Sequence, residues 1–194
     1  SLITFVRHQK TSLNLKNYFV GAGSNPNIII KSRKKISNKY YDLLISSELK
    51  RAIQSSIYFN YKKALKNKLL NEINYGSAEG KNYSTLKKNY PKIVKSWSRG
   101  IDIRFPGGEN TSDVKKRVLS FLKLLSKISY KKDIIIITHS YFLRVLIGLV
   151  YNLDIKKVYK LKIDHLKELE FIRNENLFLP NLQRNDIRKF CEQI

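Results

Sequence analysis

The chain has one cysteine, three histidines and no long apolar run. Its one cysteine, Cys191, cannot form an internal disulfide, so a reducing cytoplasm is the expected compartment. The longest apolar runs, at 134–137 and 145–151, are far below the roughly 18 residues of a transmembrane helix, and the apolar start is too short for a signal peptide. Three separated histidines give no metal-ligand spacing. We therefore expect no disulfide, no membrane contact and no metal.

Acidic residues are scarce. Lys and Arg number 38 against 15 Asp and Glu, which gives a net charge of +23 and makes acidic partners a possibility to weigh. A nucleic-acid-binding protein favours one basic face with interleaved aromatic residues. Here lysines occur in nearly every segment, with small clusters at 31–39, 115–117 and 156–162. We interpret the excess as AT-rich coding bias on solvated surfaces and expect no specific nucleic-acid binding, while attraction of phosphorylated small molecules stays open.

Short β-branched runs alternate with longer amphipathic segments, a pattern typical of an α/β sheet with crossover helices. The length of 194 residues fits a single domain over 1–194, with 42% hydrophobic residues to form its core. Strands are expected at 2–6, 43–45 and 134–138, an extended segment ending in a glycine turn at 69–80, and a hairpin at 169–173 and 177–179. Helices are expected at 48–63, at 83–97 with a break before Pro91, at 112–128 with Ser112 as N-cap, at 141–151, and in short form at the end.

Two of the three histidines follow predicted strands directly. His8 comes after ITFVR, and His139 comes after IIIIT. In open α/β sheets, ligands bind beyond the carboxyl ends of the strands. A lone histidine at a strand end is usually structural, but Arg7 beside His8 and Arg144 after His139 make a shared site the better interpretation.

Five short motifs then occur in an order that resembles one family. They are RHQKTSLN at 7–14, SSELKRAIQSS at 46–56, LNEINYGSAEG at 70–80, PGGEN at 106–110 and THSYFLR at 138–144. This order resembles the larger branch of the histidine phosphatase superfamily, over about three quarters of the chain. The resemblance implies a phosphoglycerate mutase-like fold: a three-layer α/β sandwich with a mostly parallel sheet and helices on both faces.

The resemblance also implies roles. His8 would attack phosphorus and carry the phosphoryl group, which divides one difficult step into two easier ones. Arg7, Arg51 and Asn14 would bind the phosphate oxygens, since the guanidinium fork matches phosphate geometry. His139 would be a second phosphate contact that shares the growing charge. No metal or organic cofactor is implied.

Glu72 matches the position that serves in this family as general acid, a role that needs a carboxyl pKa raised toward neutrality. Glu79 is the competing carboxylate, ranked lower on its motif position. His165 has no motif around it and is taken as a residue of the tail.

Departures from the family pattern concern the pocket. Gln9 stands where the pattern has glycine after the nucleophile, so its side chain could narrow the pocket, donate a hydrogen bond or block the site. Ser140 and Tyr141 replace the glycines expected after His139, which makes the leaving-group pocket unusual.

The expected function is therefore hydrolysis of a phosphorylated small molecule through a phosphohistidine on His8. A phosphoglycerate mutase is the first alternative, kept open by Arg99 and Arg104, although the segment 81–105 over the pocket is short for one. A noncatalytic binder of phosphorylated ligands is the second, and a nucleic-acid-binding protein the third. The oligomeric state and the substrate are left open.

Overall fold

A mixed β-sheet forms the centre of the structure. The computed structural model describes residues 1–30, 35–59, 61, 63–173 and 178–180. Within them six strands form one sheet in the order β3-β2-β4-β1-β5-β6. The pairs β3-β2, β2-β4 and β4-β1 are parallel, and β1-β5 and β5-β6 are antiparallel. The strands are β1 Leu2–Arg7, β2 Leu43–Ser46, β3 Leu65–Lys66, β4 Ile134–Thr138, β5 Glu168–Arg173 and β6 Phe178–Pro180.

The central strand β4 is buried throughout because its sequence, IIIIT, is apolar on both sides. Side chains of a strand alternate between faces. Ile134 and Ile136 accordingly join one apolar cluster, and Ile135 and Ile137 join another. This places a core on each face of the sheet.

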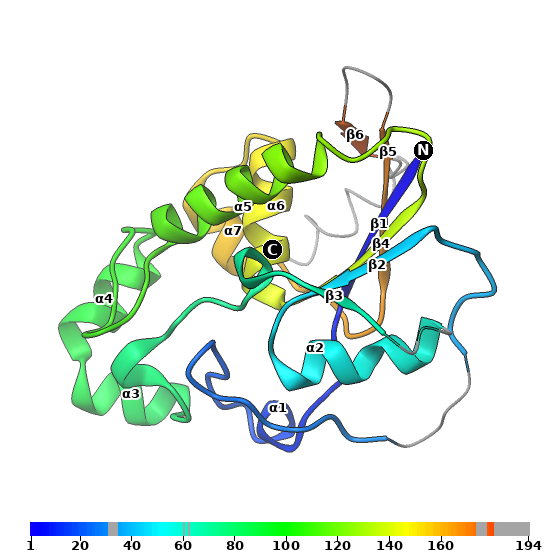
Figure 1. Cartoon of the computed structure of the whole chain (residues 1–194). Coiled ribbons are helices and arrows are strands. Elements are labelled where there is room, and N and C mark those ends of the chain that lie inside the picture. The colour runs from blue at the N-terminus through cyan, green and yellow to red at the C-terminus, as the bar shows by residue number, and fades with distance from the viewer. Residues whose placement is uncertain (31–34, 60, 62, 174–177, 181–194) are drawn as a thin grey trace.

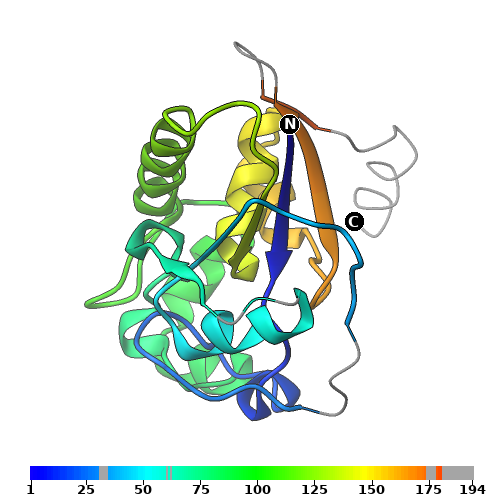
Figure 2. The same cartoon turned by 45° about the vertical axis from the view of Figure 1, so that its right-hand side comes forward.

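Helices cover both faces, and the predicted three-layer sandwich is confirmed (Figures 1 and 2). The first core contains residues of α5, α6 and α7, and the second contains Ala52 of α2 with Tyr58 and Phe59 of the following 3-10 turn. The helices are α1 Ser12–Leu15, α2 Lys50–Gln54, α3 Tyr83–Asn89, α4 Pro91–Ser98, α5 Thr111–Leu125, α6 Ser140–Val150 and α7 Ile155–Lys160. None of these helices is long and apolar enough to span a membrane.

Two sequence expectations were wrong in detail. The helix expected at 48–63 ends at Gln54 and continues as a 3-10 helix over Ser55–Phe59. There the hydroxyl of Ser55 donates to the carbonyl of Arg51 at 2.6 Å, a local bond of the kind that competes with regular helix geometry. The segment 69–80, expected to be extended, contains 3-10 turns at Lys68–Leu70 and Gly76–Ala78, although its glycine turn at Gly80 is present with φ +66°.

The start of α5 was also placed wrongly. Its N-cap is Asn110, not Ser112, because Asn110 and Asp113 exchange side-chain to backbone bonds in a capping box. The hydroxyl of Ser112 binds Asp102 instead. The predicted helix break is confirmed, since α3 ends at Asn89 and α4 begins with Pro91 in its first turn.

The helices α3 and α4 form a cap beside the sheet, at the lower left in Figure 1, with their own small core around Leu86, Val94 and Phe105. The predicted hairpin is present as the antiparallel pair β5 and β6. The short final helix and Cys191 lie outside the described residues.

Candidate active site

The two strand-end histidines meet because β1 and β4 are parallel neighbours in register. Arg7 pairs with Thr138, so the next residues, His8 and His139, lie side by side, and the His8 amide donates to the Thr138 carbonyl at 3.0 Å. Their ring centroids are 5.0 Å apart. A cavity of about 690 Å³ opens beside His8, at the edge of the sheet where ligands of open α/β folds bind.

His8 is a neutral imidazole with a defined tautomer. Its Nδ1 lies 2.6 Å from the Gln9 carbonyl oxygen, which can only accept, so Nδ1 carries the proton. The lone pair is left on Nε2. Burial lowers the pKa of His8 well below its usual value, and the nearby Arg51 and Arg7 lower it further. The ring is therefore held in the state that can act as a nucleophile.

His139, the neighbour of His8, is fully buried. Its Nε2 is 2.6 Å from the Ser47 hydroxyl, and its Nδ1 has no hydrogen-bond partner among the described residues. Burial, with Arg51 and His8 adding to it, lowers the pKa of His139. It is not one of the described residues that line the cavity, so contact with a phosphate there stays a prediction.

Arg7 and Asn14 both line the cavity. Arg7 donates from Nη1 to the Ile163 carbonyl at 2.6 Å, while its buried Nε has no partner in the described part of the chain. Burial lowers the pKa of Arg7 to about 10, which still leaves it charged at neutral pH. Asn14 accepts the Thr11 amide and hydroxyl on its Oδ1, at 3.0 and 2.9 Å. These hydrogen bonds fix the positions of both side chains in the cavity wall.

Arg51 is completely buried and holds a loop rather than the cavity wall. Its guanidinium donates to the carbonyls of Ser24, Gly21 and Val20 at 2.7, 3.0 and 3.3 Å. Its Nε has no partner among the described residues. The phosphate-binding role predicted for Arg51 stays a prediction, and the charge of Arg51 lowers the pKa of both His8 and His139.

Glu72 is 5% exposed and lines the cavity together with His8. Its carboxylate accepts the Tyr141 amide at 3.0 and 3.2 Å and the Ile73 amide at 3.1 Å. Burial raises the pKa of the carboxyl, against the opposing effect of Arg51 and of these amide bonds. Burial thus favours the protonated form of this carboxyl more than in a solvent-exposed glutamate.

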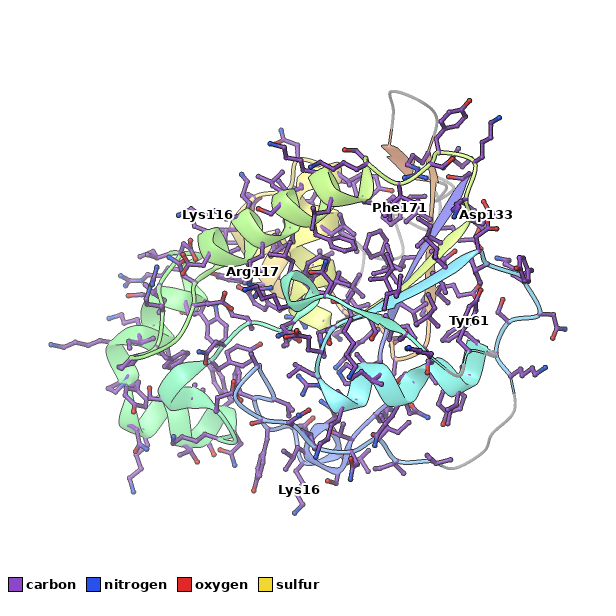
Figure 3. The ribbon with its side chains drawn as sticks, viewed as in Figure 1. Lys16, Tyr61, Lys116, Arg117, Asp133 and Phe171 are labelled. Carbon is purple, nitrogen blue, oxygen red and sulfur yellow. The ribbon has the colours of Figure 1, made fainter. Side chains whose placement is uncertain are left out.

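The PGGEN motif is linked by hydrogen bonds to the segment that carries Glu72. Glu109 binds Arg117 of α5 through two bonds of 2.8 Å, and Arg117 reaches the carbonyls of Leu69 and Asn71 at 3.0 and 2.9 Å. In Figure 3 Arg117 extends from α5 toward this segment. A Cβ on Gly108 would lie 2.7 Å from the Asn74 carbonyl oxygen, so glycine is needed where the two loops touch.

The carboxylate of Glu79, the competing acid candidate, accepts hydrogen bonds mainly from backbone amides. It accepts the amides of Gly21, Gly23 and Tyr75 at 3.0, 3.1 and 3.2 Å, and the Ser24 hydroxyl at 2.8 Å. It is not one of the described residues of the cavity wall. Glu79 therefore fastens the same loop that Arg51 holds.

Gln9 does not narrow the cavity. Its side-chain oxygen accepts the backbone amide of Lys10 at 2.8 Å, its nitrogen donates to the Tyr58 hydroxyl at 3.4 Å, and it is not one of the described residues of the cavity wall. Ser140 and Tyr141, the other departures from the family pattern, do line the cavity.

His165 is a site residue that sequence reasoning missed. It lines the cavity, its ring centroid is 5.3 Å from that of His8, and its Nδ1 donates to the His8 carbonyl at 2.6 Å. Burial lowers its pKa to about 4. No local motif marks it, because only the pairing of β5 with β1 brings it there. Arg144 and Asp164 also line the cavity.

No group of His, Cys, Asp and Glu in the described ranges could hold a metal ion. The described residues offer a candidate nucleophile in His8, a candidate proton donor in Glu72, and cations, among them Arg7, that can bind anionic oxygens.

Known proteins resemble this chain in sequence and in fold. The chain is 28% identical to a 2,3-bisphosphoglycerate-dependent phosphoglycerate mutase of Methanococcus vannielii, over 83% of this chain and 86% of the relative. It is 22% identical to phosphoserine phosphatase 1 of Hydrogenobacter thermophilus, over 84% and 82%. The crystal structure of a putative α-ribazole-5′-P phosphatase from Escherichia coli superposes with a TM-score of 0.80 at 18% identity, over 93% and 94% of the two chains. A sequence model of the Histidine phosphatase superfamily (branch 1) matches residues 3–178, and the chain belongs to this family of phosphatases and mutases.

Proposed function

We propose that the protein hydrolyses phosphomonoesters of small molecules through a phosphohistidine on His8. One observation carries the proposal: a neutral imidazole with a free Nε2 and a buried carboxyl with a raised pKa, Glu72, line the same cavity. A nucleophile and an acid for the leaving group are the two reacting groups that such a reaction needs.

The reaction has two steps. Nε2 of His8 attacks phosphorus, the bond from phosphorus to the ester oxygen breaks, and Glu72 gives its proton to the departing alcohol. Water then attacks the phosphohistidine, Glu72 accepts a proton from that water, and the bond between nitrogen and phosphorus breaks to release phosphate. Arg7 and Asn14, which line the cavity, bind the phosphate oxygens. Arg51 and His139, which are buried outside the cavity wall, assist in stabilising the charge of the phosphoryl group.

Phosphoglycerate mutase activity is the second candidate, favoured by relatives such as the Methanococcus vannielii mutase. A mutase must keep water from the phosphohistidine until the phosphoryl group is returned. Here α3 and α4 supply the cap, followed by the loop 99–110 with φ +78° at Gly100 and +71° at Gly107. This short cap favours hydrolysis.

The experiment compares two products from 3-phosphoglycerate in the presence of 2,3-bisphosphoglycerate. Inorganic phosphate released faster than 2-phosphoglycerate is formed supports the phosphatase, and the reverse supports the mutase. A panel of other phosphomonoesters runs beside it. Saturable binding of these esters without any turnover would instead indicate the noncatalytic binder.

The single cysteine is consistent with a cytoplasmic enzyme acting on phosphorylated metabolites. The excess of lysine, within this proposal, raises the local concentration of such anions around the chain.

A further inference from the structure

Five aromatic side chains form a closed ring of contacts on the cavity wall. In order around the ring, the centroid distances are 5.1 Å for Phe19–Tyr75, 6.4 Å for Tyr75–Tyr141, 6.4 Å for Tyr141–Tyr159, 5.7 Å for Tyr159–Trp97 and 5.6 Å for Trp97–Phe19. All five line the same cavity as His8 and Glu72. We call these five residues the aromatic ring wall.

The members come from separate parts of the chain: the loop after α1, the loop after Glu72, α4, α6 and α7. Tyr141 is buried, while the other four keep part of their surface exposed. The five rings pack against the apolar cores beside them, and they also form part of the wall of an open cavity. A ligand in the cavity can therefore cover the part of their surface that stays exposed.

The aromatic ring wall lies on the leaving-group side of the site. A general acid must lie next to the oxygen that it protonates, so the wall around Glu72 faces the alcohol part of the substrate. The Tyr141 amide binds the Glu72 carboxylate directly, and Tyr75 follows Glu72 by three residues. The described residues of the cavity wall include three cations, Arg7, Lys10 and Arg144. Arg144 donates to the Tyr159 carbonyl at 3.2 Å, beside the ring wall, while Arg7 directly precedes His8 and is available for the phosphate.

The size of the cavity agrees with a large alcohol. About 690 Å³ is within the roughly 300–1,000 Å³ of pockets that hold drug-sized ligands. Resting on the phosphatase function proposed above, we propose that the preferred substrates are phosphomonoesters whose alcohol carries an aromatic or heteroaromatic ring, which packs against the aromatic ring wall.

Adenosine 5′-monophosphate and ribose 5-phosphate test the proposal as a matched pair. Both lose phosphate from the same primary oxygen of ribose, so the demand on the acid is alike and only the base differs. Stacking of a base on aromatic side chains should raise kcat/KM about tenfold for the nucleotide. Equal kcat/KM for the two esters, or a preference for 3-phosphoglycerate over the nucleotide, would overturn the proposal.

Variants of the ring wall locate the effect. Trp97→Leu should bring the ratio of the two kcat/KM values close to one, while Trp97→Phe, which keeps an aromatic face, should retain most of it. Tyr159→Leu should lower the ratio as well, which serves if Trp97→Leu does not fold. Tyr40→Leu is the matched control, because Tyr40 is 83% exposed and does not line the cavity. An unchanged ratio in both Trp97→Leu and Tyr159→Leu would refute the proposed contact.

Binding separates this proposal from the proposed function. Trp97 is the single tryptophan of the chain, so fluorescence excited at its red edge reports on the cavity. Saturation by adenosine 5′-monophosphate at about tenfold lower concentration than by ribose 5-phosphate supports the aromatic subsite even if neither ester is hydrolysed. Hydrolysis of both esters at equal rates and with equal binding would retain the phosphatase and remove the subsite.

Discussion

The guanidinium of Arg117 donates two hydrogen bonds of 2.8 Å to the Glu109 carboxylate. It also donates to the carbonyls of Leu69 and Asn71, shortly before Glu72 in the chain. The acid candidate is therefore placed by a residue that does not line the main cavity. An arginine with paired donors is suited to fix a backbone segment in this way.

Replacement of Arg117 should lower activity through Glu72. Arg117→Leu frees the segment that carries the acid, and a displacement of about 1 Å can cost on the order of 100-fold in rate. We expect kcat to fall by about 10- to 100-fold, with a larger loss for an alkyl phosphate than for p-nitrophenyl phosphate. The matched control is Lys116→Leu, at an exposed neighbouring position of α5. Equal losses for the two esters would show that Arg117 does not act through the acid.

Glu72 itself should show the same dependence on the leaving group, more strongly. Glu72→Gln removes the proton donor but keeps the shape, and general acid catalysis contributes about 10²–10⁴-fold. Hydrolysis of an alkyl phosphate should fall by a factor in that range, while p-nitrophenyl phosphate, whose leaving group is already stable, should lose much less. Similar slowing of both esters would assign Glu72 to positioning of the phosphate.

Stability should fall as the solution is made acidic. Burial lowers the pKa of His8, His139 and His165 in the folded chain, the last to about 4, whereas an unfolded histidine titrates near 6.5. Between those values the unfolded chain binds more protons, so the free energy of unfolding decreases as pH falls from about 7 toward about 4. Glu72 acts oppositely, because its raised pKa favours the folded state at low pH, but it is one group against three.

Thermal unfolding followed by circular dichroism at pH 5, 6 and 7 measures this trend. The melting temperature should rise with pH, and His165→Gln should flatten the slope because it removes one of the three groups. A melting temperature that is higher at pH 5 than at pH 7 would contradict the neutral state assigned to the histidines.

Gln9→Gly should change activity little. The Gln9 side chain binds Tyr58 and the Lys10 amide rather than lining the cavity, so its removal should alter kcat/KM by less than about threefold while lowering stability by up to about 1 kcal/mol through the added backbone freedom. The measurement is the initial rate for one ester beside a denaturation curve. A tenfold gain in rate would show that Gln9 does restrict the pocket.

Much of the fold follows from local sequence. The strands over 2–6, 43–45 and 134–138 were predictable because they are short β-branched runs between turn signals, and the neighbouring position of His8 and His139 follows from those strand ends. The start of α5 was predicted wrongly at Ser112, because serine and asparagine are both good caps and the reciprocal bonds of Asn110 with Asp113 decide where the helix begins.

The rest depends on contacts between distant segments. His165 reaches His8 through the pairing of β5 with β1, and the aromatic ring wall joins five segments that share no sequence pattern. Arg51 illustrates the same limit. Its position after β2 was evident, but the loop carbonyls that hold it become apparent only once residues 20–24 fold over it.

The central claim is that His8 carries the phosphoryl group, and the most direct measurement is to trap and map it. The chain is mixed with a ³²P-labelled phosphomonoester, quenched rapidly, and digested for mass spectrometry. We expect an acid-labile, base-stable label on His8, absent from His8→Ala and retained in His165→Gln, whose ring lies 5.3 Å away. Label that persists in His8→Ala, or that maps to His165 or His139, would contradict the account.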